Sequence, residues 1–471
     1  MTASTWIIVS TVVQIVVCGP YRSSENAGKF WHVTDFHYDQ FYGNGIYPLS
    51  SCRDTIENGD TRQPEALGDY DCDSPWTLVN ASVYAMQTIE PNPDFIIWTG
   101  DDTPHVPNSM LNEDKVLSTI FNITELLMDA FPNTKFIPVF GNHDYHPKHQ
   151  MPPNPTAFYS NVTDLWQPWL DQFPGATDLF REKTYYTAKI EPYRFVGLNT
   201  VFYYTNNKLT MDISDPAGQF SWLEQVLTDA RRDNETVVIV GHVPPGCFER
   251  SRGKCWFYPE FNAQYIEVIQ QFHDVIAFQL FAHQHDDSFR LFYDDEGKAI
   301  SSLFLAPAVT PWNTSLAGVG PNNPSVRLFT FNREDGLLMN WEQYYLDLSE
   351  VDSADSSMWK REYSAIKDYD IPDVTTASLQ SLVNGFETSD VLFNRYYLFN
   401  SVSYNTQPCT DECKITQLCS INQVDFTKFD KCVENSDDPN GTIRLHISWD
   451  VCLVGLIIAV WSTYCIGYLF N

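Results

Sequence analysis

Five apolar runs of the chain each end in a cluster of side chains that can bind metal ions. The clusters read Asp-x-His, Gly-Asp, Gly-Asn-His-Asp, Gly-His and His-x-His, and their candidate ligands are Asp35, His37, Asp101, Asn142, His242, His283 and His285. A single cluster of this kind is usually a turn or a helix cap. Five clusters in succession, each directly after an apolar run, predict instead that one metal centre gathers them.

Carboxylate, imidazole and amide side chains are ligands suited to zinc, iron or manganese. Three candidates can hold one ion and three can hold a second: Asp35, His37 and His285 for the first, Asn142, His242 and His283 for the second. Asp101 can bridge the two ions. Two ions about 3.5–4 Å apart can hold a hydroxide and clamp a phosphoryl oxygen for in-line displacement. The set therefore predicts hydrolysis of a phosphate ester.

The elements that must position these residues are short strands. Most of the apolar runs are rich in β-branched or aromatic residues, as expected of strands buried on both faces. We predict strands at 30–34, 95–99, 136–140, 195–198, 237–240, 276–281 and 303–306, and helical spacing occurs at 217–229 and 262–272. Because α/β sheets build their sites at the carboxyl ends of strands, the pattern predicts an α/β fold of layered sheets covered by helices.

The composition is that of a globular protein with a strongly acidic surface. Hydrophobic residues make up 43% of the 471 residues, which is enough for a core and excludes a disordered chain. The 60 Asp and Glu against 29 Lys and Arg give a net charge of −31. Such a surface repels phosphate backbones, so we expect no nucleic acid polymer as a partner. A small anionic substrate is compatible where metal cations overcome the field.

Both ends of the chain carry uncharged apolar segments. Residues 1–19 are typical of a secretory signal peptide, with an N-terminal membrane anchor as the alternative. Residues 451–471 form an uncharged tail behind a polar spacer at 436–450, which is the pattern of a GPI-attachment signal. The attachment residue would be Asn435, Ser436 or Asn440. A retained transmembrane helix is the alternative. We expect the secretory pathway and the extracellular face of the cell membrane, or shedding and secretion.

Eight cysteines lie between the two terminal segments, an even number that fits four disulfides in an oxidising compartment. Proximity in sequence favours the pairs Cys52–Cys72, Cys247–Cys255, Cys409–Cys413 and Cys419–Cys432. A zinc ribbon is disfavoured because the spacings lack two C-x-x-C knuckles. Six glycosylation sequons begin at Asn80, Asn122, Asn161, Asn234, Asn313 and Asn440. Together with the cysteines and the terminal segments, they predict a glycoprotein.

The series of clusters resembles the calcineurin-like metallophosphoesterase superfamily. The local sequences at 31–39 (WHVTDFHYD), 98–105 (WTGDDTPH) and 241–246 (GHVPPG) are similar to the acid sphingomyelinase-like phosphodiesterases. The spacing of Cys409, Cys413, Cys419 and Cys432 resembles the C-terminal subdomain of that family. The GPI-type tail points to its membrane-anchored b-type branch. The resemblance covers nearly the whole chain between the terminal segments.

The resemblance implies two central mixed β-sheets flanked by helices over 28–348, followed by a small helical, disulfide-containing subdomain over 349–435. It implies a dinuclear zinc centre on the seven candidate ligands. It also implies that His143 and His105 are the phosphate-contacting and leaving-group histidines. His143 lies next to Asn142 and can stabilise charge in the transition state, and His105 lies four residues after Asp101 and can reach the same phosphate.

The sequence departs from the superfamily pattern at few positions. Ala282 stands where the superfamily usually has Gly, and Asp102 adds a carboxylate beside Asp101, but no ligand is lost. Acid sphingomyelinase itself carries an N-terminal saposin-type domain, and only a short segment precedes the first cluster here. Soluble substrates are therefore favoured over sphingomyelin. A purple acid phosphatase would want a Tyr ligand where Pro104 stands, so that family is disfavoured.

The predicted function is a secreted or cell-surface dinuclear zinc phosphodiesterase, a phosphoric diester hydrolase. The expected substrates are small phosphorylated molecules, either nucleotides with diester or anhydride bonds or phosphocholine-type esters. We also expect the protein to associate with the membrane through its lipid anchor. Two alternatives stay open: a sphingomyelin phosphodiesterase, and a GPI-anchored binding protein that modulates membrane lipids or receptors on the same scaffold. The complete set of seven ligands favours an enzyme, because a drifted scaffold would tolerate their loss.

Overall fold

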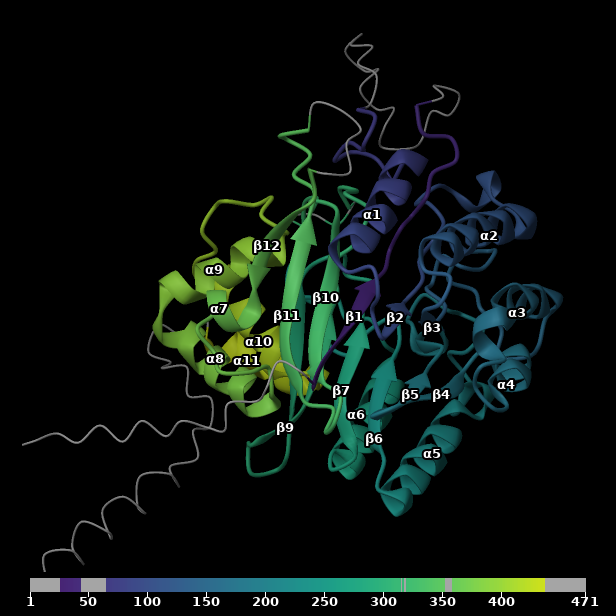
Figure 1. The fold of residues 1–471 in the computed structure, drawn as a ribbon. Coiled ribbons are helices and arrows are strands. Elements are labelled where there is room, and N and C mark those ends of the chain that lie inside the picture. Colours follow the sequence, from purple (N-terminus) through teal and green to yellow (C-terminus); the bar gives the residue numbers. More distant parts are fainter. Residues whose placement is uncertain (1–25, 44–64, 315, 317–318, 352–357, 437–471) are drawn as a thin grey trace, which may run out of the picture.

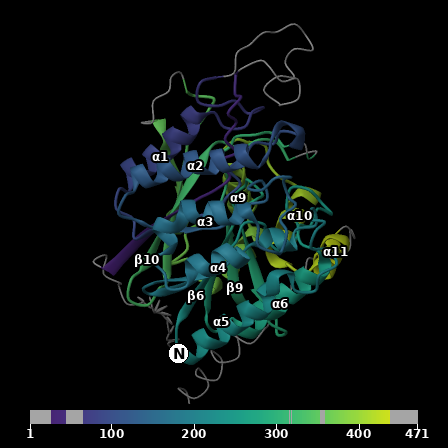
Figure 2. The same cartoon turned by 90° about the vertical axis from the view of Figure 1, so that its right-hand side faces the viewer.

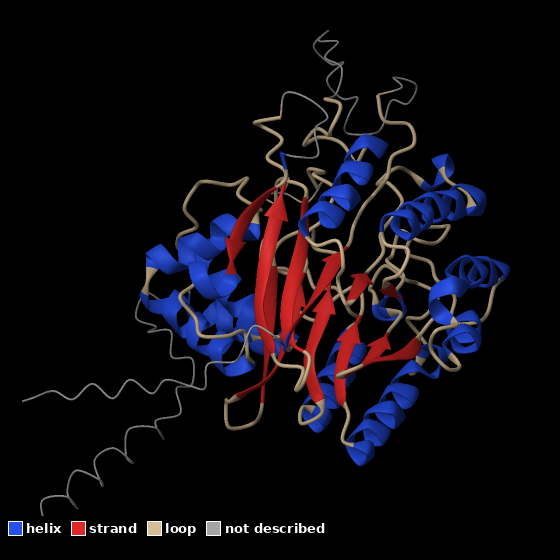
Figure 3. Ribbon diagram, viewed as in Figure 1, coloured by secondary structure: helices blue, strands red, loops and turns tan. Residues whose placement is uncertain are grey.

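Two six-stranded sheets packed face to face form the centre of the molecule, with helices on both sides (Figure 1 and Figure 3). The structure is a computed structural model, which describes residues 26–43, 65–314, 316, 319–351 and 358–436. The inner faces of the sheets meet through aromatic side chains, such as the rings of Phe95 and Phe195 at 4.9 Å and of Phe304 and Phe329 at 5.5 Å. Large buried rings of this kind contribute most of the apolar area that holds such layers together.

The first sheet has the strand order β12-β11-β10-β1-β2-β3. Its strands are β1 (Ala27–Val33), β2 (Phe95–Trp98), β3 (Lys135–Pro138), β10 (Ser325–Asn332), β11 (Leu338–Tyr345) and β12 (Lys360–Ser364). β1, β2 and β3 run parallel, whereas β10, β11 and β12 are added antiparallel. The three parallel strands therefore end at one common edge.

The second sheet has the order β4-β5-β6-β7-β9-β8. Its strands are β4 (Tyr186–Ile190), β5 (Tyr193–Gly197), β6 (Thr236–Val240), β7 (Ile276–Phe281), β8 (Ser288–Tyr293) and β9 (Ala299–Leu305). β5, β6, β7 and β9 are parallel, and β4 and β8 close the two edges antiparallel. Its central strands thus deliver their following loops to one edge, as in the first sheet.

The helices form two groups that follow one another along the chain. The first group, brought to the front in Figure 2, contains α1 (Trp76–Ile89), α2 (Glu113–Ala130), α3 (Ala157–Leu170), α4 (Ala176–Lys183), α5 (Gln219–Asp233) and α6 (Pro259–Phe272). The second group, at the left of Figure 1, contains α7 (Ala365–Asp368), α8 (Thr376–Thr388), α9 (Asp390–Asn400), α10 (Glu412–Asn422) and α11 (Phe426–Ser436). The predicted architecture of two mixed sheets flanked by helices is confirmed.

The sequence prediction missed five strands, β4, β8, β10, β11 and β12. Charged or polar side chains interrupt them, and in β8 and β10 these are the buried Arg290 and Arg327. Both arginines are neutralised by carboxylates far away in the chain, Glu249 and Asp287 respectively. A pattern search for apolar runs cannot detect such strands. One of them, β12, lies within the predicted subdomain 349–435 and joins the first sheet, so that region is not helical throughout.

Three predicted cysteine pairs are disulfides in the structure: Cys247–Cys255, Cys409–Cys413 and Cys419–Cys432. Cys52 of the fourth pair, Asn440, and the predicted signal and tail at 1–19 and 451–471 lie outside the described residues. Of the other sequons, Asn122, Asn161, Asn234 and Asn313 have exposed side chains and Asn80 is half-buried. Among the described residues, no helix combines the length and the apolar character needed to cross a membrane.

Candidate metal centre

All seven candidate ligands lie in loops after the carboxyl ends of strands, where the two sheets meet. The strands that precede them are β1 for Asp35 and His37, β2 for Asp101, β3 for Asn142, β6 for His242, and β7 for His283 and His285. Because these strands are parallel neighbours within their sheets, their loops are delivered to a common edge. The loops also touch across the sheets, since the backbone amide of His283 donates to Asp35 Oδ2 at 3.4 Å.

The ligand atoms approach one another at distances suited to shared ions. His37 Nε2 lies 3.6 Å from Asp35 Oδ1, which lies 3.3 Å from His285 Nε2. Two ligand atoms about 2.0–2.1 Å from one tetrahedral zinc would themselves be roughly 3.3–3.4 Å apart. Asp101 Oδ2 lies 3.6 Å from His37 Nε2 and 3.1 Å from His242 Nε2. One carboxylate oxygen is thus shared between two groups of ligands, as a bridge requires.

Several buried polar atoms of this cluster lack a hydrogen-bond partner among the described residues. They are Asp35 Oδ1, His37 Nε2, Asn142 Oδ1, His242 Nε2 and both ring nitrogens of His283. A buried polar atom without a partner is costly, unless it binds a group such as a metal ion. The opposite nitrogens, Nδ1 of His37 and His242, each lie 2.7 Å from a backbone carbonyl, of Thr103 and Thr99. These bonds turn the Nε2 lone pairs inward, so the residues fit a pair of ions.

The backbone at the ligands is held in a conformation that side chains rarely adopt. Five of the ligands have positive φ: Asp35 (51°), His37 (41°), Asp101 (61°), His283 (74°) and His285 (65°). The loops after β2 and β3 also approach closely at two glycines. A Cβ on Gly100 would lie 2.3 Å from the Gly141 nitrogen, and one on Gly141 would lie 2.3 Å from the Asp101 nitrogen. Only glycine permits this approach, which brings Asp101 and Asn142 together.

The side chain of Asp144, which the sequence prediction did not single out, holds these two loops in place. Its carboxylate accepts hydrogen bonds from the backbone amides of Gly141 (2.7 Å), Asp101 (2.9 Å) and Asp102 (2.7 Å). Burial, followed by the charge of Asp101, raises the pKa of Asp144 to about 7. The backbone amide of His143 donates to Asp101 Oδ1 at 2.7 Å, which leaves Oδ2 to face the histidines.

The charges of the centre are balanced between buried acids and imidazoles. Burial alone would raise the pKa of Asp101, but the charge of the nearby His242 outweighs it and holds the pKa well below the usual range. Burial alone would lower the pKa of His242, but Asp101 raises it to about 9. Asp35 behaves like Asp101, because the nearby imidazoles of His285 and His37 outweigh its burial and lower its pKa. The buried carboxylates therefore require cations beside them.

His105 and His143, the two histidines predicted to act on the substrate, lie beside the ligands. The ring of His105 lies 4.0 Å from that of His37 and 4.6 Å from that of His143. Burial lowers the pKa of both His105 and His143 well below the usual range. His105 Nδ1 and the His105 backbone amide both donate to the buried Asp73 carboxylate, at 2.8 and 2.7 Å. Asp73 thereby fixes the ring and directs Nε2 away from itself.

Asp73 belongs to no strand-end cluster, so the pattern that found the ligands could not find it. The indole of Trp312 stacks on the His105 ring, with 3.7 Å between the ring centres and 11° between the ring planes. Together, these contacts restrict His105 to one orientation. The nitrogens of His37, His105 and His285 also lie close enough to share an ion. Geometry alone thus leaves His105 within reach of the first ion as well as of a substrate.

The loop after β7 is held from a distance by the C-terminal helices. The buried Arg290 of β8 donates to Gln284 Oε1 at 3.1 Å and to Glu249 Oε2 at 2.5 Å. Asn400, the last residue of α9, donates to the carbonyl of Asp287 at 2.9 Å and accepts from the Asp287 amide at 3.1 Å. The residues around His283 and His285 are therefore tied to a helix more than a hundred positions later in the chain.

A cavity of about 430 Å³ opens onto the centre. Its lining includes ligands and both predicted catalytic histidines, and also side chains outside the clusters: Lys148, His149, Tyr204, Phe248, Lys254, Trp256 and Trp312. A cavity of this size suits a small substrate. The sequence prediction missed these lining residues because they come from loops that only the tertiary fold brings together.

Comparison with known proteins agrees with this geometry. The family model of the calcineurin-like phosphoesterases matches residues 28–287, and that of the acid sphingomyelin phosphodiesterase C-terminal region matches residues 298–438. The chain is 43% identical over 412 residues to acid sphingomyelinase-like phosphodiesterase 3b of Mus musculus, covering 86% of this chain and 90% of that protein. It is 37% identical over 418 residues to cyclic GMP-AMP phosphodiesterase SMPDL3A of Bos taurus, covering 88% and 92%.

A third relative is similar over a larger share of the chain. Sphingomyelinase phosphodiesterase C of Dictyostelium discoideum is 37% identical over 441 residues, covering 91% of this chain and 97% of that protein. The fold and the dinuclear arrangement of the centre are those of the matched phosphoesterase family. The chain is therefore a phosphoric diester hydrolase that belongs to the calcineurin-like phosphoesterases and, within them, to the acid sphingomyelinase-like phosphodiesterases.

Proposed function

We propose that this protein is a dinuclear zinc phosphodiesterase of the cell surface that hydrolyses small nucleotide-type or phosphocholine-type substrates. The observation that carries the proposal is the cluster of buried ligand atoms without hydrogen-bond partners around Asp101 Oδ2. Four imidazoles, two carboxylates and one amide form the candidate ligand set. This mixture suits zinc better than magnesium or calcium, which prefer oxygen ligands.

Each residue of the centre has a distinct role in this proposal. Bound ions would supply Lewis-acid activation of water and of a phosphoryl oxygen. Asp101 holds the two ligand groups together, and His143 donates a hydrogen bond to the developing negative charge. His105, oriented by Asp73 at 2.8 Å, exchanges a proton with the leaving oxygen.

The proposed substrates are supported by the size of the cavity and by the names of relatives. The cavity of about 430 Å³ admits a small molecule rather than a polymer. The relatives that cover most of the chain are named as phosphodiesterases, including one of cyclic GMP-AMP. Small phosphodiesters and phosphoanhydrides are therefore the first substrates to examine.

A direct test combines metal analysis with hydrolysis of a chromogenic diester. Purified protein should contain close to two zinc ions per chain and should hydrolyse bis(4-nitrophenyl) phosphate. A chelator should abolish this activity, and added zinc should restore it. A protein that contains no ions and hydrolyses no phosphodiester would contradict the proposal and favour a binding protein on the same scaffold.

The proposed location is the extracellular face of the cell membrane, through a signal peptide at 1–19 and a GPI anchor that replaces 451–471. The even set of cysteines and the exposed sequons at Asn122, Asn161, Asn234 and Asn313 support an extracellular glycoprotein. Phosphatidylinositol-specific phospholipase should release the protein from intact cells. Retention on the membrane, with the tail detected by mass spectrometry, would favour the transmembrane alternative.

A further inference from the structure

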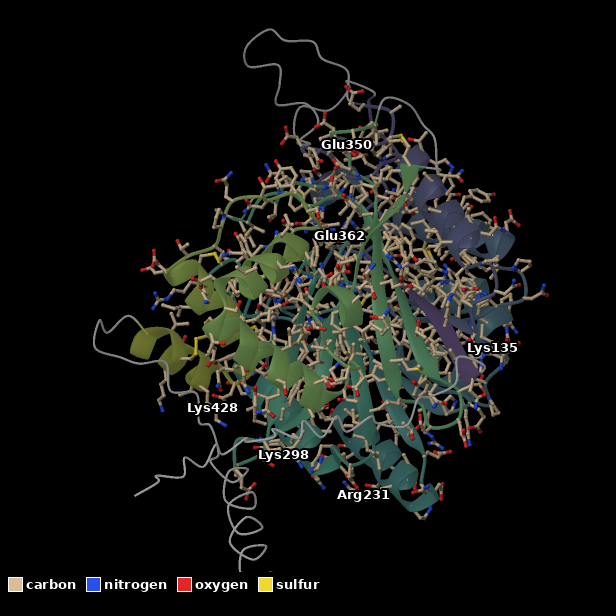
Figure 4. All side chains as sticks on the ribbon, turned by 60° about the vertical axis from the view of Figure 1, so that its left-hand side comes forward. Lys135, Arg231, Lys298, Glu350, Glu362 and Lys428 are labelled. Carbon is tan, nitrogen blue, oxygen red and sulfur yellow. A yellow bond between two sulfur atoms is a disulfide. The ribbon has the colours of Figure 1, made fainter. Side chains whose placement is uncertain are left out.

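Two lysines line the cavity beside the metal centre, although the protein as a whole is strongly acidic. They are Lys148 and Lys254, and Asp101 is the sole carboxylate among the described lining residues. The basic residues Lys135, Arg231, Lys298 and Lys428, by contrast, lie on the outer surface (Figure 4). In a chain with a net charge of −31, two ammonium groups at this position are unlike the rest of the surface.

Lys148 is anchored on the side of the cavity that carries His105. Its ammonium donates to the carbonyl of Val106 at 2.9 Å, and its backbone amide donates to Asn108 Oδ1 at 3.0 Å. Both partners belong to the loop that follows His105. The side chain is partly buried, yet it forms no ion pair with a carboxylate of the described residues. Its charge is thus held next to the centre, where it faces the carboxylates of Asp73 and Asp101 without pairing directly with either.

Lys254 approaches from the side of the second sheet. Its ammonium lies over the indole of Trp256, 5.1 Å from the ring centre, and this indole lies 4.4 Å from the ring of His283. The ring face of Trp256 that could hold a quaternary ammonium is therefore already covered by a cation. In the described part of the chain, Lys254 also has no carboxylate partner. The two lysines thus place positive charge on different walls of one cavity.

A substrate with one phosphodiester carries a single negative charge, which the ions of the centre would balance. Two further ammonium groups would then have no directly paired anion in a partly buried site, and a choline group would be repelled by them. A second phosphate on the same substrate would accept charge-assisted hydrogen bonds from both. The lysines therefore discriminate between the two substrate types that the proposed function leaves open.

Resting on the proposed function, we propose that Lys148 and Lys254 form a subsite for a second phosphate of the substrate. The subsite favours nucleoside polyphosphates and dinucleotides over phosphocholine esters. The second phosphate would come either from an anhydride next to the scissile bond or from the other diester of a dinucleotide. The two lysines are specificity-determining residues in this scheme and take no part in bond cleavage.

The test compares Lys148→Gln, Lys254→Gln and the double variant with the wild-type protein on four substrates. For ATP and for a cyclic dinucleotide, kcat/KM should fall about 10- to 100-fold for each lysine removed, as expected for loss of a charge-assisted hydrogen bond. For bis(4-nitrophenyl) phosphate it should stay unchanged, and for 4-nitrophenyl phosphorylcholine it should stay unchanged or rise. A loss with ATP alone assigns the anhydride, and a loss with the dinucleotide alone assigns the second diester.

Two control variants test whether the effect depends on a positive charge at these particular positions. Lys298→Gln removes the same charge from the exposed turn between β8 and β9 and should leave all four values unchanged. Lys254→Arg keeps the charge and should retain most of the activity on ATP. Equal kcat/KM values of wild-type and double variant on both polyanionic substrates would overturn the subsite while diesterase activity stands. If the wild-type hydrolyses no diester, the calorimetric affinity for ADP still decides, since the double variant should bind it at least tenfold more weakly.

Discussion

The two sheets supply the candidate metal centre with different candidate ligands and hold them in different ways. The first sheet supplies three of its four ligands as oxygen donors, Asp35, Asp101 and Asn142, whereas the second supplies three imidazoles. On the first side the support is local: backbone amides of Asp35 and His37 donate to carbonyls of Gly100 and Asp101 at 2.8 and 3.0 Å. Asp144 adds three more bonds from the same set of loops.

On the second side the support comes from far along the chain. Asp287, two residues after the candidate ligand His285, forms two hydrogen bonds with Asn400 of α9: its carbonyl accepts from the Asn400 side-chain amide, and its backbone amide donates to the Asn400 carbonyl. Arg290 links Gln284 to Glu249, and Asn400 also accepts from Arg250 at 2.8 Å. The loops after β2 and β3 are thus held largely by one another, whereas the loop that carries His283 and His285 is also held by the C-terminal helices. The C-terminal region therefore helps to position the loop that carries the candidate ligands His283 and His285.

The largest loss of metal binding should follow from substitution of Asp101, the residue that the two halves of the centre share. Asp101→Asn removes the negative charge that both groups of histidines approach, so both ion sites should weaken. Loss of a residue that hydrogen-bonds a metal ligand typically lowers the metal affinity about 10- to 100-fold. Loss of a bridging ligand should lower the metal affinity further. Elemental analysis and hydrolysis of bis(4-nitrophenyl) phosphate measure the effect. A variant with full ion content would show that Asp101 is not the bridge.

The next effect concerns residues of the first half that face the substrate. His143→Ala and His105→Ala should keep near-normal ion content and lose about 10²- to 10⁴-fold in turnover. The loss for His105→Ala should be smaller with a nitrophenolate leaving group, which needs little protonation. Equal losses for good and poor leaving groups would make His105 a residue that positions the phosphate. An ion content that falls in His105→Ala would instead make it a ligand.

A smaller effect should appear when the distant support of the second half is removed. Asn400→Ala deletes the donor to the Asp287 carbonyl, so the loop that carries His283 and His285 should loosen. We expect a metal affinity lower by about 10- to 100-fold, measured as the chelator concentration that halves activity. Asn384→Ala, at an exposed position of α8, is the matched control and should change nothing. A folded Asn400→Ala protein with unchanged affinity would show that the second half supports itself.

The smallest effect concerns a buried histidine in the first sheet. Burial, followed by the charge of Arg327, lowers the pKa of His32 to about 3, so the folded protein keeps this imidazole neutral. The unfolded chain binds a proton below pH 6.5, hence the stability that His32 provides is present above pH 6.5 and is lost as the pH falls toward 3. The slope from this residue is at most about 1.4 kcal/mol per pH unit.

His32→Gln keeps a side chain that can bond Thr99 Oγ1, now 3.0 Å from His32 Nε2, and does not titrate. Relative to wild-type, the variant should therefore gain stability as the pH falls from 7 to 4.5. Urea unfolding of both proteins at each pH gives the difference in free energy of unfolding. His273→Gln, at an exposed position after α6, is the control. A difference that does not vary with pH would contradict the assignment.

The ligand-bearing strands could be predicted from the sequence because each combines an apolar run with a polar end. The helices at Gln219–Asp233 and Pro259–Phe272 could be predicted from apolar spacing for the same local reason. Asp73, Asp144 and Lys148 could not, because their roles depend on loops that meet only in the folded chain. The hydrogen bonds between Asn400 and Asp287 could not be predicted either, because the two residues lie far apart in the sequence.

Five of the seven candidate ligands hold a backbone conformation that glycine would adopt without strain. Each non-glycine residue in this conformation costs of the order of 1–2 kcal/mol. If a copy of the gene no longer had to encode an active enzyme, mutations to glycine at these positions would relieve backbone strain. Asp101→Gly is one example. Such mutations would remove the candidate ligands. Drift under selection for folding alone favours glycine at all five positions. The presence of Asp or His at all five positions in this chain is therefore better explained by the chemistry of the site than by the stability of the fold.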